Sequence, residues 1–235
     1  MDRRLREYLE GALGVSVSAF PTAGVAVRES GAYKHEPGRM LEVIRLGGGV
    51  LAAGTATALE RVGPVLNALL PAELFSPLGV AELQRALELP DDKAPEHGFD
   101  YVLTEPSGLR AVSIAWDTMP LHKADIPRGE YELRMSERRP SERADFVWGF
   151  DCLVGGRRAG RCAIIWNTPE VAALGVGVDE RFRGRGCGLA VVHAAAEYVL
   201  AEGGAALYGA DADNVASLRL ARSLGFWLFS EQIIA

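Results

Sequence analysis

One short stretch, residues 170–188, constrains the fold of this chain more than any other. It reads EVAALGVGV, DERF and RGRGCG, and an apolar, alanine-rich run follows it to residue 202. The first part has the composition of a buried strand, and the run after it has that of a helix. The chain must therefore pass from a strand into a helix through a turn made of glycine and arginine.

This glycine-arginine turn, residues 183–188, has the chemistry of an anion site. Glycine has no Cβ, so backbone N–H groups can approach a ligand closely. The start of a helix adds N–H groups without intrahelical acceptors and the positive end of the helix dipole. Arg181, Arg183 and Arg185 can add charge-assisted contacts to phosphate oxygens. We therefore expect the turn to hold a pyrophosphate.

The spacing of the glycines excludes two common phosphate-binding motifs but does not prove that the turn binds phosphate. It does not match the dinucleotide fingerprint G-x-G-x-x-G, and no G-K-[ST] of a Walker loop follows it. A tight connection with solvated arginines explains the same residues, so this alternative stays open on the turn alone.

Composition limits the class of protein. With 235 residues, 49% of them apolar, the chain can bury one large core or two smaller ones. Its formal net charge of −6 argues against nucleic-acid binding, which needs a broad basic surface. No apolar run is long enough for a membrane span. The three cysteines lack metal-site spacing, so we expect buried free thiols and a cytoplasmic protein, with Cys152 facing Cys162 across a hairpin as the alternative.

Hydrophobic periodicity predicts an α+β protein of two domains. A polar stretch with two prolines, residues 117–130, separates an N-terminal α+β domain (1–128) from a second domain (129–235). We expect strands at 24–30, 40–46, 99–105, 109–116, 131–137, 145–154, 161–166, 170–178, 205–211 and 226–234, and helices at 56–70, 77–89, 186–202 and 214–225. Residues 47–54 are too rich in glycine to assign, and Pro64 should start, kink or interrupt its helix. The order in the second domain predicts a mixed sheet with helices packed on it.

Two motifs in this domain resemble a known superfamily. VDERFRGRGCG at 178–188, with its helix, resembles the acetyl-CoA pyrophosphate loop of the GCN5-related N-acetyltransferase (GNAT) superfamily. NVASLRLARSLGF at 214–226 resembles the next helix of that fold. The resemblance covers about residues 130–235 and implies a GNAT-like twisted mixed sheet with flanking helices. The N-terminal half shows no matching motif, although its order of elements fits a degenerate copy of the same fold.

The resemblance implies a reaction and a set of cofactor contacts. The reaction is direct attack by a primary amine, on a small molecule or a peptide, upon acetyl-CoA, with no metal. Asn214 is also a good helix N-cap on its residue type alone. By similarity, the residues expected to bind the cofactor are Val176, Val178, Arg183, Gly184, Arg185, Gly186, Cys187, Gly188, Asn214 and Ser217.

The same resemblance suggests the catalytic groups. Glu170, at the head of the strand, stands where some members carry a catalytic glutamate, and its even spacing from Val178 places both on one face of a regular strand. Asp211 or a water relay is the alternative base. Ala221 occupies the position of the tyrosine that usually assists the departing sulfur. Tyr208 or Ser217 could take that role, or the sulfur could leave unassisted.

Two other functions and one structural gap remain. A catalytically silent acyl-CoA sensor fits Ala221, and a nucleotide-binding domain could use the same turn. Family domains usually have two strands after the second motif, but few residues follow Phe226. We expect the N-terminal half, or a partner subunit in a homodimer, to cover the edge that a missing strand would leave.

Overall fold

The computed structural model describes residues 1–30, 39–112, 131–141 and 144–235. Two compact units can be distinguished. Unit 1 comprises Met1–Asp100, Ala210–Asn214 and Leu228–Ala235, and unit 2 comprises Tyr101–Gly209 and Val215–Trp227. The expected domain boundary lies outside the described residues, so domains 1–128 and 129–235 stay a prediction. Within the described ranges, no helix is long and apolar enough to span a membrane.

The strands of unit 1 lie in the order β1-β3-β2-β10. Their bounds are β1 Gly24–Glu29, β2 Leu41–Leu46, β3 Gly49–Gly54 and β10 Trp227–Ile234. β1 is parallel to β3, β2 is antiparallel to β3, and β10 is antiparallel to β2 with Ile233 opposite Val43. The expectation that the N-terminal half covers the last strand is therefore confirmed. β4 (Glu96–Leu103) begins in unit 1 and ends in unit 2.

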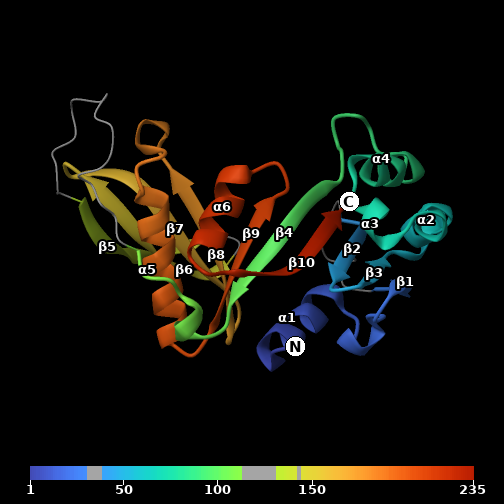
Figure 1. The fold of residues 1–235 in the computed structure, drawn as a ribbon, viewed down its shortest axis with the longest axis horizontal. Helices are drawn as coiled ribbons and strands as arrows, with labels where there is room; N and C mark the ends of the chain where they lie inside the picture. Colours follow the sequence, from blue (N-terminus) through green and yellow to red (C-terminus); the bar gives the residue numbers. More distant parts are fainter. Residues whose placement is uncertain (31–38, 113–130, 142–143) are drawn as a thin grey trace. The chain divides into compact units, whose positions relative to one another are not determined.

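Three helices cover one face of the unit 1 strands (Figure 1). They are α2 (Ala56–Ala68), α3 (Pro71–Leu74) and α4 (Pro77–Ala86). Their shared core with β2, β3 and β10 is fully apolar; it includes Leu41, Val43, Val50, Val62, Leu66, Leu74, Leu83 and Ile233. α2 continues through Pro64, so this proline does not end the helix.

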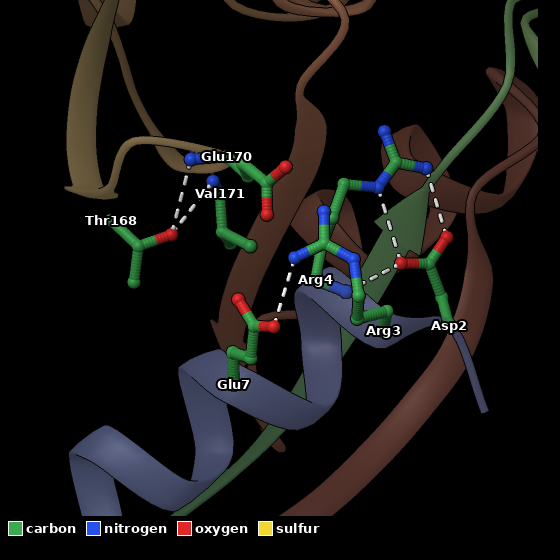
Figure 2. A network of polar contacts seen from close by, with 7 residues as sticks. All are labelled: Asp2, Arg3, Arg4, Glu7, Thr168, Glu170 and Val171. Carbon is green, nitrogen blue, oxygen red and sulfur yellow. Dashed lines mark hydrogen bonds and ion pairs between the residues drawn. The ribbon is translucent and has the colours of Figure 1, made fainter.

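The first helix of unit 1, α1 (Arg3–Leu13), begins at a side-chain cap. Asp2 Oδ1 accepts from the amide of Arg4 (2.8 Å), and Asp2 Oδ2 pairs with the Arg4 guanidinium (2.8 Å). Arg3 and Glu7 form an i,i+4 ion pair one turn further on (Figure 2). Capping and the leucines Leu5, Leu9 and Leu13, which are buried, explain why this short segment is helical.

Two buried acids of unit 1, Glu231 on β10 and Asp100 on β4, take part in polar contacts with β10 or its neighbours. Glu231 forms an ion pair with Arg45 on the neighbouring strand β2 and accepts a hydrogen bond from His97 Nε2 (2.9 Å). Asp100 Oδ2 accepts from Ser230 Oγ (2.9 Å), and burial raises the pKa of Asp100. Each of these buried acids thus has a partner, as burial of a polar group requires.

Unit 2 contains a mixed sheet in the order β9-β8-β7-β6-β5. The strands are β5 Tyr131–Ser141, β6 Ala144–Val154, β7 Arg157–Thr168, β8 Val171–Val178 and β9 Ala205–Asp211. β5 to β8 are antiparallel neighbours, and β8 is parallel to β9. The predicted mixed sheet with packed helices is confirmed.

Two further α-helices and three short 3₁₀ turns lie within the described residues. α5 (Cys187–Ala201) packs on β6, β7 and β8 and lies across that sheet in Figure 1. α6 (Val215–Ser223) precedes β10. The 3₁₀ turns are η1 (Val17–Ala19), η3 (Pro106–Gly108) and η5 (Glu180–Phe182). Residues 109–112, where a strand was expected to begin, are not in a strand.

A close backbone contact at Gly49 gives a test of the unit 1 sheet. A Cβ added to Gly49 would lie 1.7 Å from the carbonyl oxygen of Pro21. Gly49→Ala should therefore lower the free energy of unfolding by about 1–3 kcal/mol, because the backbone must move to relieve the overlap. Urea unfolding followed by circular dichroism measures the change.

The matched control is Gly11→Ala in α1, where an added Cβ meets no described atom within 4 Å. That change should raise the stability by up to about 1 kcal/mol, because alanine favours helix. Equal effects of the two substitutions would contradict the close approach of the Pro21 carbonyl to Gly49.

Candidate functional site

β8 and β9 are paired only where they begin. Val171, Ala172 and Ala173 are opposite Ala205, Ala206 and Leu207. β8 then continues to Val178 and β9 to Asp211 without further pairing to one another. On its other side β8 stays paired with β7 to its last residue. The edge of residues 174–178 toward β9 therefore offers backbone N–H and C=O groups to an extended ligand.

Two glycines, Gly175 and Gly177, leave part of the surface of β8 without side chains. An added Cβ at Gly175 or Gly177 would meet no atom within 4 Å among the described residues, and both positions are exposed. A helix packed against these glycines would have put atoms within that range. Because these residues have no side chains, there is free space over this face of β8, and a ligand can approach the backbone closely there.

The chain leaves β8 through a capped 3₁₀ turn. Asp179 accepts from the amide of Arg181 (3.0 Å) and from two nitrogens of its guanidinium (3.0 and 2.7 Å). These hydrogen bonds lower the pKa of Asp179 to about 2. Phe182, which directly follows Arg181, is buried, and the guanidinium of Arg185 lies 5.9 Å from its ring centre. Arg181, expected from the sequence to contact phosphate, is thus held by Asp179. Arg183 and Arg185 are the cations of the glycine-arginine turn itself, and Arg183 Nη1 lies 3.6 Å from Glu180 Oε1 in an exposed ion pair.

The turn itself has the backbone that the glycines allow. Gly184 and Gly186 have φ of +71° and +82°, in the left-handed region, and Gly186 is the N-cap of α5. The Gly186 carbonyl accepts from Ala190 N (2.9 Å), so the amides of the intervening first turn have no intrahelical acceptor. Arg183 is exposed, with Nε 3.4 Å from the Val178 carbonyl.

Val178 connects the strand to this helix start. Its Cγ2 lies 3.2 Å from the position that a Cβ on Gly188 would take, so a larger residue at 188 would push α5 away from β8. The open β8 edge and the first turn of α5 therefore form one continuous surface of unit 2. Uncompensated amides, positive side chains and absent Cβ atoms are the features that fit a diphosphate followed by an extended amide-containing arm.

Glu170 lies in the turn before β8 rather than in the strand. Its amide and that of Val171 donate to Thr168 Oγ1 (3.3 and 3.0 Å; Figure 2), and its carbonyl accepts from Ala205 N (2.8 Å). The β7–β8 register shifts just before this turn, between Trp166 and Thr168. The alternation of β8 therefore does not determine the direction of the Glu170 side chain. The backbone of Glu170 lies at the end of β8 where β8 and β9 are paired.

Tyr208 is the first residue of β9 after the pairing with β8 ends. Its side chain is buried and packs edge-on against Phe226, with 5.9 Å between ring centres. The Tyr208 hydroxyl has no hydrogen-bond partner within the described part of the chain. Burial raises its pKa; the Ser217 side chain opposes this shift from nearby, without reaching hydrogen-bond geometry. An unpartnered buried hydroxyl is costly, which marks this position for a ligand.

The other predicted residues are divided between the units. Asn214 belongs to unit 1 and stands directly before α6, with its amide donating to the Asp211 carbonyl (3.0 Å). Ser217 lies in the first turn of α6 in unit 2. The cofactor contacts expected of both residues stay a prediction, as does the role of Asp211.

Sequence reasoning missed the partner of Cys187. Cys152 was considered opposite Cys162, but the β6–β7 register places Gly160 opposite Cys152 and Phe150 opposite Cys162. Cys152 instead lies near Cys187 at the start of α5, because a Cβ on its register partner Gly160 would lie 3.4 Å from the Cys187 Cβ, and each thiol shifts the pKa of the other. No local sequence signal reveals this contact, because it depends on the register of one hairpin and on where α5 begins. In the described ranges, no group of three or more His, Cys, Asp or Glu residues could hold a metal ion.

The fold and the turn fit an acyltransferase domain, and comparison with known families specifies its family. A family model described as the acetyltransferase (GNAT) family matches residues 109–226, half of the chain. The chain belongs to the GNAT acetyltransferase family.

Several solved structures are similar to part of the chain at low identity. A GCN5-related N-acetyltransferase from Kribbella flavida is 14% identical, with a TM-score of 0.42, and the match covers 59% of this chain and 56% of that one. A GNAT-family acetyltransferase from Colwellia psychrerythraea is 12% identical, with a TM-score of 0.43 and coverage of 59% and 55%. A GCN5-related N-acetyltransferase from Sphaerobacter thermophilus is 15% identical, with a TM-score of 0.44 and coverage of 66% and 55%. The chain spans little more than half the length of each of these structures. No curated protein matches the chain.

The glycine-arginine turn can be tested against a second turn of similar composition. Gly155, Gly156, Arg157 and Arg158 join β6 to β7, but no helix begins there. Inorganic pyrophosphate should shift the backbone amide resonances of residues 184–189 in a heteronuclear NMR titration and leave those of 155–158 in place, because only the former lie at a helix N-terminus.

The matched variants are Arg183→Gln and Arg158→Gln. The first should weaken pyrophosphate binding about fivefold to tenfold, which is on the order of 1 kcal/mol for one charge-assisted contact. The second should leave it unchanged. Equal losses in the two variants would show that general positive charge, and not the helix start, attracts the anion.

Proposed function

We propose that this protein is an acetyl-CoA-dependent N-acetyltransferase that acetylates a primary amine of a small molecule or a peptide by direct attack. The observation that carries the proposal is the end of the β8–β9 pairing at Ala173 and Leu207, beside a glycine-arginine turn, in a chain of the GNAT family. When bound, acetyl-CoA supplies the acetyl group in activated form, as a thioester.

The chain's contribution to binding divides into two parts. The amides of residues 184–188, including those of Cys187 and Gly188, would hold the diphosphate, and Arg183 and Arg185 would balance its charge. The free edge of β8 would hydrogen-bond the amides of the pantetheine arm through backbone groups near Val176 and Val178. Asn214 and Ser217 are the further contacts that the family resemblance implies.

Glu170 is our proposed general base. An amine acceptor is protonated in water at neutral pH, so a proton must leave before its nitrogen can attack. A carboxylate at the paired end of the opening is chemically suited to accept that proton at Oε1 or Oε2, directly or through one water. The half-buried setting of Glu170 and the fixing of its backbone by Thr168 and Ala205 support this role.

Tyr208 is our proposed general acid. Its hydroxyl is without a described partner, and its raised pKa keeps it protonated well above neutral pH. It can therefore hold a proton at Oη for the departing sulfur. Tyr208 would take the role of the tyrosine that the family usually carries at the position of Ala221. Ala221 is buried and has no proton donor.

Two substitutions test these roles. Glu170→Gln should lower kcat by about 10²–10³-fold and leave coenzyme A affinity within about twofold, because general-base catalysis is removed and the binding turn is kept. Tyr208→Phe should lower kcat by about tenfold or more. It should not lower the free energy of unfolding, because the hydroxyl it removes has no partner to lose. A coupled assay of free thiol release over a panel of amines measures kcat.

Tyr101→Phe is the matched control for Tyr208→Phe. Tyr101 is equally buried in unit 2, but its hydroxyl accepts from Arg222 Nε (3.0 Å). This change should cost about 1 kcal/mol of stability and spare kcat. Coenzyme A binding without turnover of any amine would instead favour the acyl-CoA sensor, and unchanged kcat in Glu170→Gln would remove Glu170 as the base.

A further inference from the structure

Cys152, Gly160 and Cys187 come from three elements of unit 2 and meet at one point. Cys152 on β6 is the register partner of Gly160 on β7. A Cβ built on Gly160 would lie 3.4 Å from the Cβ of Cys187, the first residue of α5. Side chains of paired residues stand on the same face of a sheet, so the Cys152 side chain also faces α5. The missing Cβ of Gly160 leaves room for the two thiols to meet beneath the start of the helix.

The two thiols are in contact and are electrostatically unequal. Both are free and buried, and each thiol shifts the pKa of the other. The Cys152 thiol lowers the pKa of Cys187; burial opposes this shift, and the charge of Arg185 lowers the pKa further. The Cys187 thiol raises the pKa of Cys152. Of the two, Cys187 at the helix N-terminus is therefore the thiol that ionises more readily, and the helix dipole also favours its thiolate.

Cys162 provides an internal contrast. It is buried on β7, its Sγ is 3.8 Å from the carbonyl of its neighbour Ala163, and burial raises its pKa to about 12. A thiol of this kind is unreactive, because the thiolate is the nucleophile.

We propose that Cys152 and Cys187 are an oxidation site at which hydrogen peroxide drives formation of a disulfide between β6 and the first residue of α5. The Cys187 thiolate attacks one peroxide oxygen, the O–O bond breaks, and Cys187 becomes a sulfenic acid while hydroxide leaves and takes up a proton as water. The Cys152 sulfur then attacks the Cys187 sulfur. An S–S bond forms, the S–O bond breaks, and the hydroxyl leaves as water with the proton of the Cys152 thiol. Two electrons pass from the thiol pair to the peroxide.

The bond should change the glycine-arginine turn. Its sulfurs must approach to about 2 Å, closer than any hydrogen-bonded pair of thiols, so Cys187 is drawn toward β6. Gly186 and Gly188 flank Cys187 and have no side chains to resist the movement. The backbone amides of residues 183–188 are therefore displaced when the pair is oxidised and return when it is reduced.

The test uses the full chain, reduced and then treated with hydrogen peroxide, which is small enough to reach a buried pair. Before alkylation, the wild type and the matched control Cys162→Ser should each show a mass loss of about 2 Da, and alkylation after denaturation should leave two cysteines unmodified in each. Peptide mapping should identify the link as Cys152–Cys187. Cys152→Ser should stop at a Cys187 sulfenic acid that dimedone traps, and Cys187→Ser should form no such link.

NMR spectra of the oxidised wild type should show shifted amide resonances for residues 183–188, reversed by dithiothreitol, with those of 155–158 unmoved. Oxidation of Cys162 as fast as of Cys187, a link that includes Cys162, or no disulfide at all would overturn the proposal. A disulfide that leaves the turn resonances in place would overturn its effect on the turn. None of these outcomes depends on the proposed function, because neither coenzyme nor acceptor is present.

Discussion

The pairing of β8 with β9 is the constraint on which the site of unit 2 depends. Two parallel strands that stayed paired to their ends would satisfy each other's backbone and leave no opening. Here three residue pairs hold the strands together at the start, and β8 then continues beside β7 alone. The unpaired edge, the unpartnered Tyr208 hydroxyl and the helix start after Val178 all lie beyond the point where the pairing ends.

The packing of α5 against β8 links this opening to the turn. Gly188 lets Val178 approach the first turn of α5, and Gly160 leaves space for Cys187 below it. Gly184 and Gly186 adopt left-handed backbone conformations that other residues rarely take. Gly160 and Gly188 therefore allow close packing, whereas Gly184 and Gly186 allow the backbone conformation of the turn. The same close packing that presents the amides also brings Cys187 against Cys152, so the anion site and the thiol pair share one helix terminus.

Local sequence patterns predicted most elements of both units but not the contacts that depend on register. The strand, turn and helix at 170–202 were predictable because apolar composition, glycine and a long helical run all agree there. β3 was not assigned, since its glycines suit a turn as well as a strand, and only Pro21 beside Gly49 shows why a Cβ is excluded. Pro64 was expected to disturb α2, but Val62 and Leu66 on either side of it are buried in the unit 1 core, and this packing outweighs the local preference.

The candidate site shows the same division. The turn and Glu170 could be named from sequence spacing and resemblance. Tyr208 could be named only as one option, since its orphaned hydroxyl depends on where the β8–β9 ladder ends, and the Cys152–Cys187 contact could not be named at all. The cofactor and catalytic roles of these residues stay predictions.

A crystal structure of the protein with coenzyme A tests the account's central claim most directly. We expect the diphosphate oxygens within about 3 Å of backbone nitrogens of residues 184–188, and the pantetheine arm along residues 174–178 of β8. A complex in which the diphosphate binds elsewhere, or in which the edge of β8 makes no contact with the arm, would contradict it.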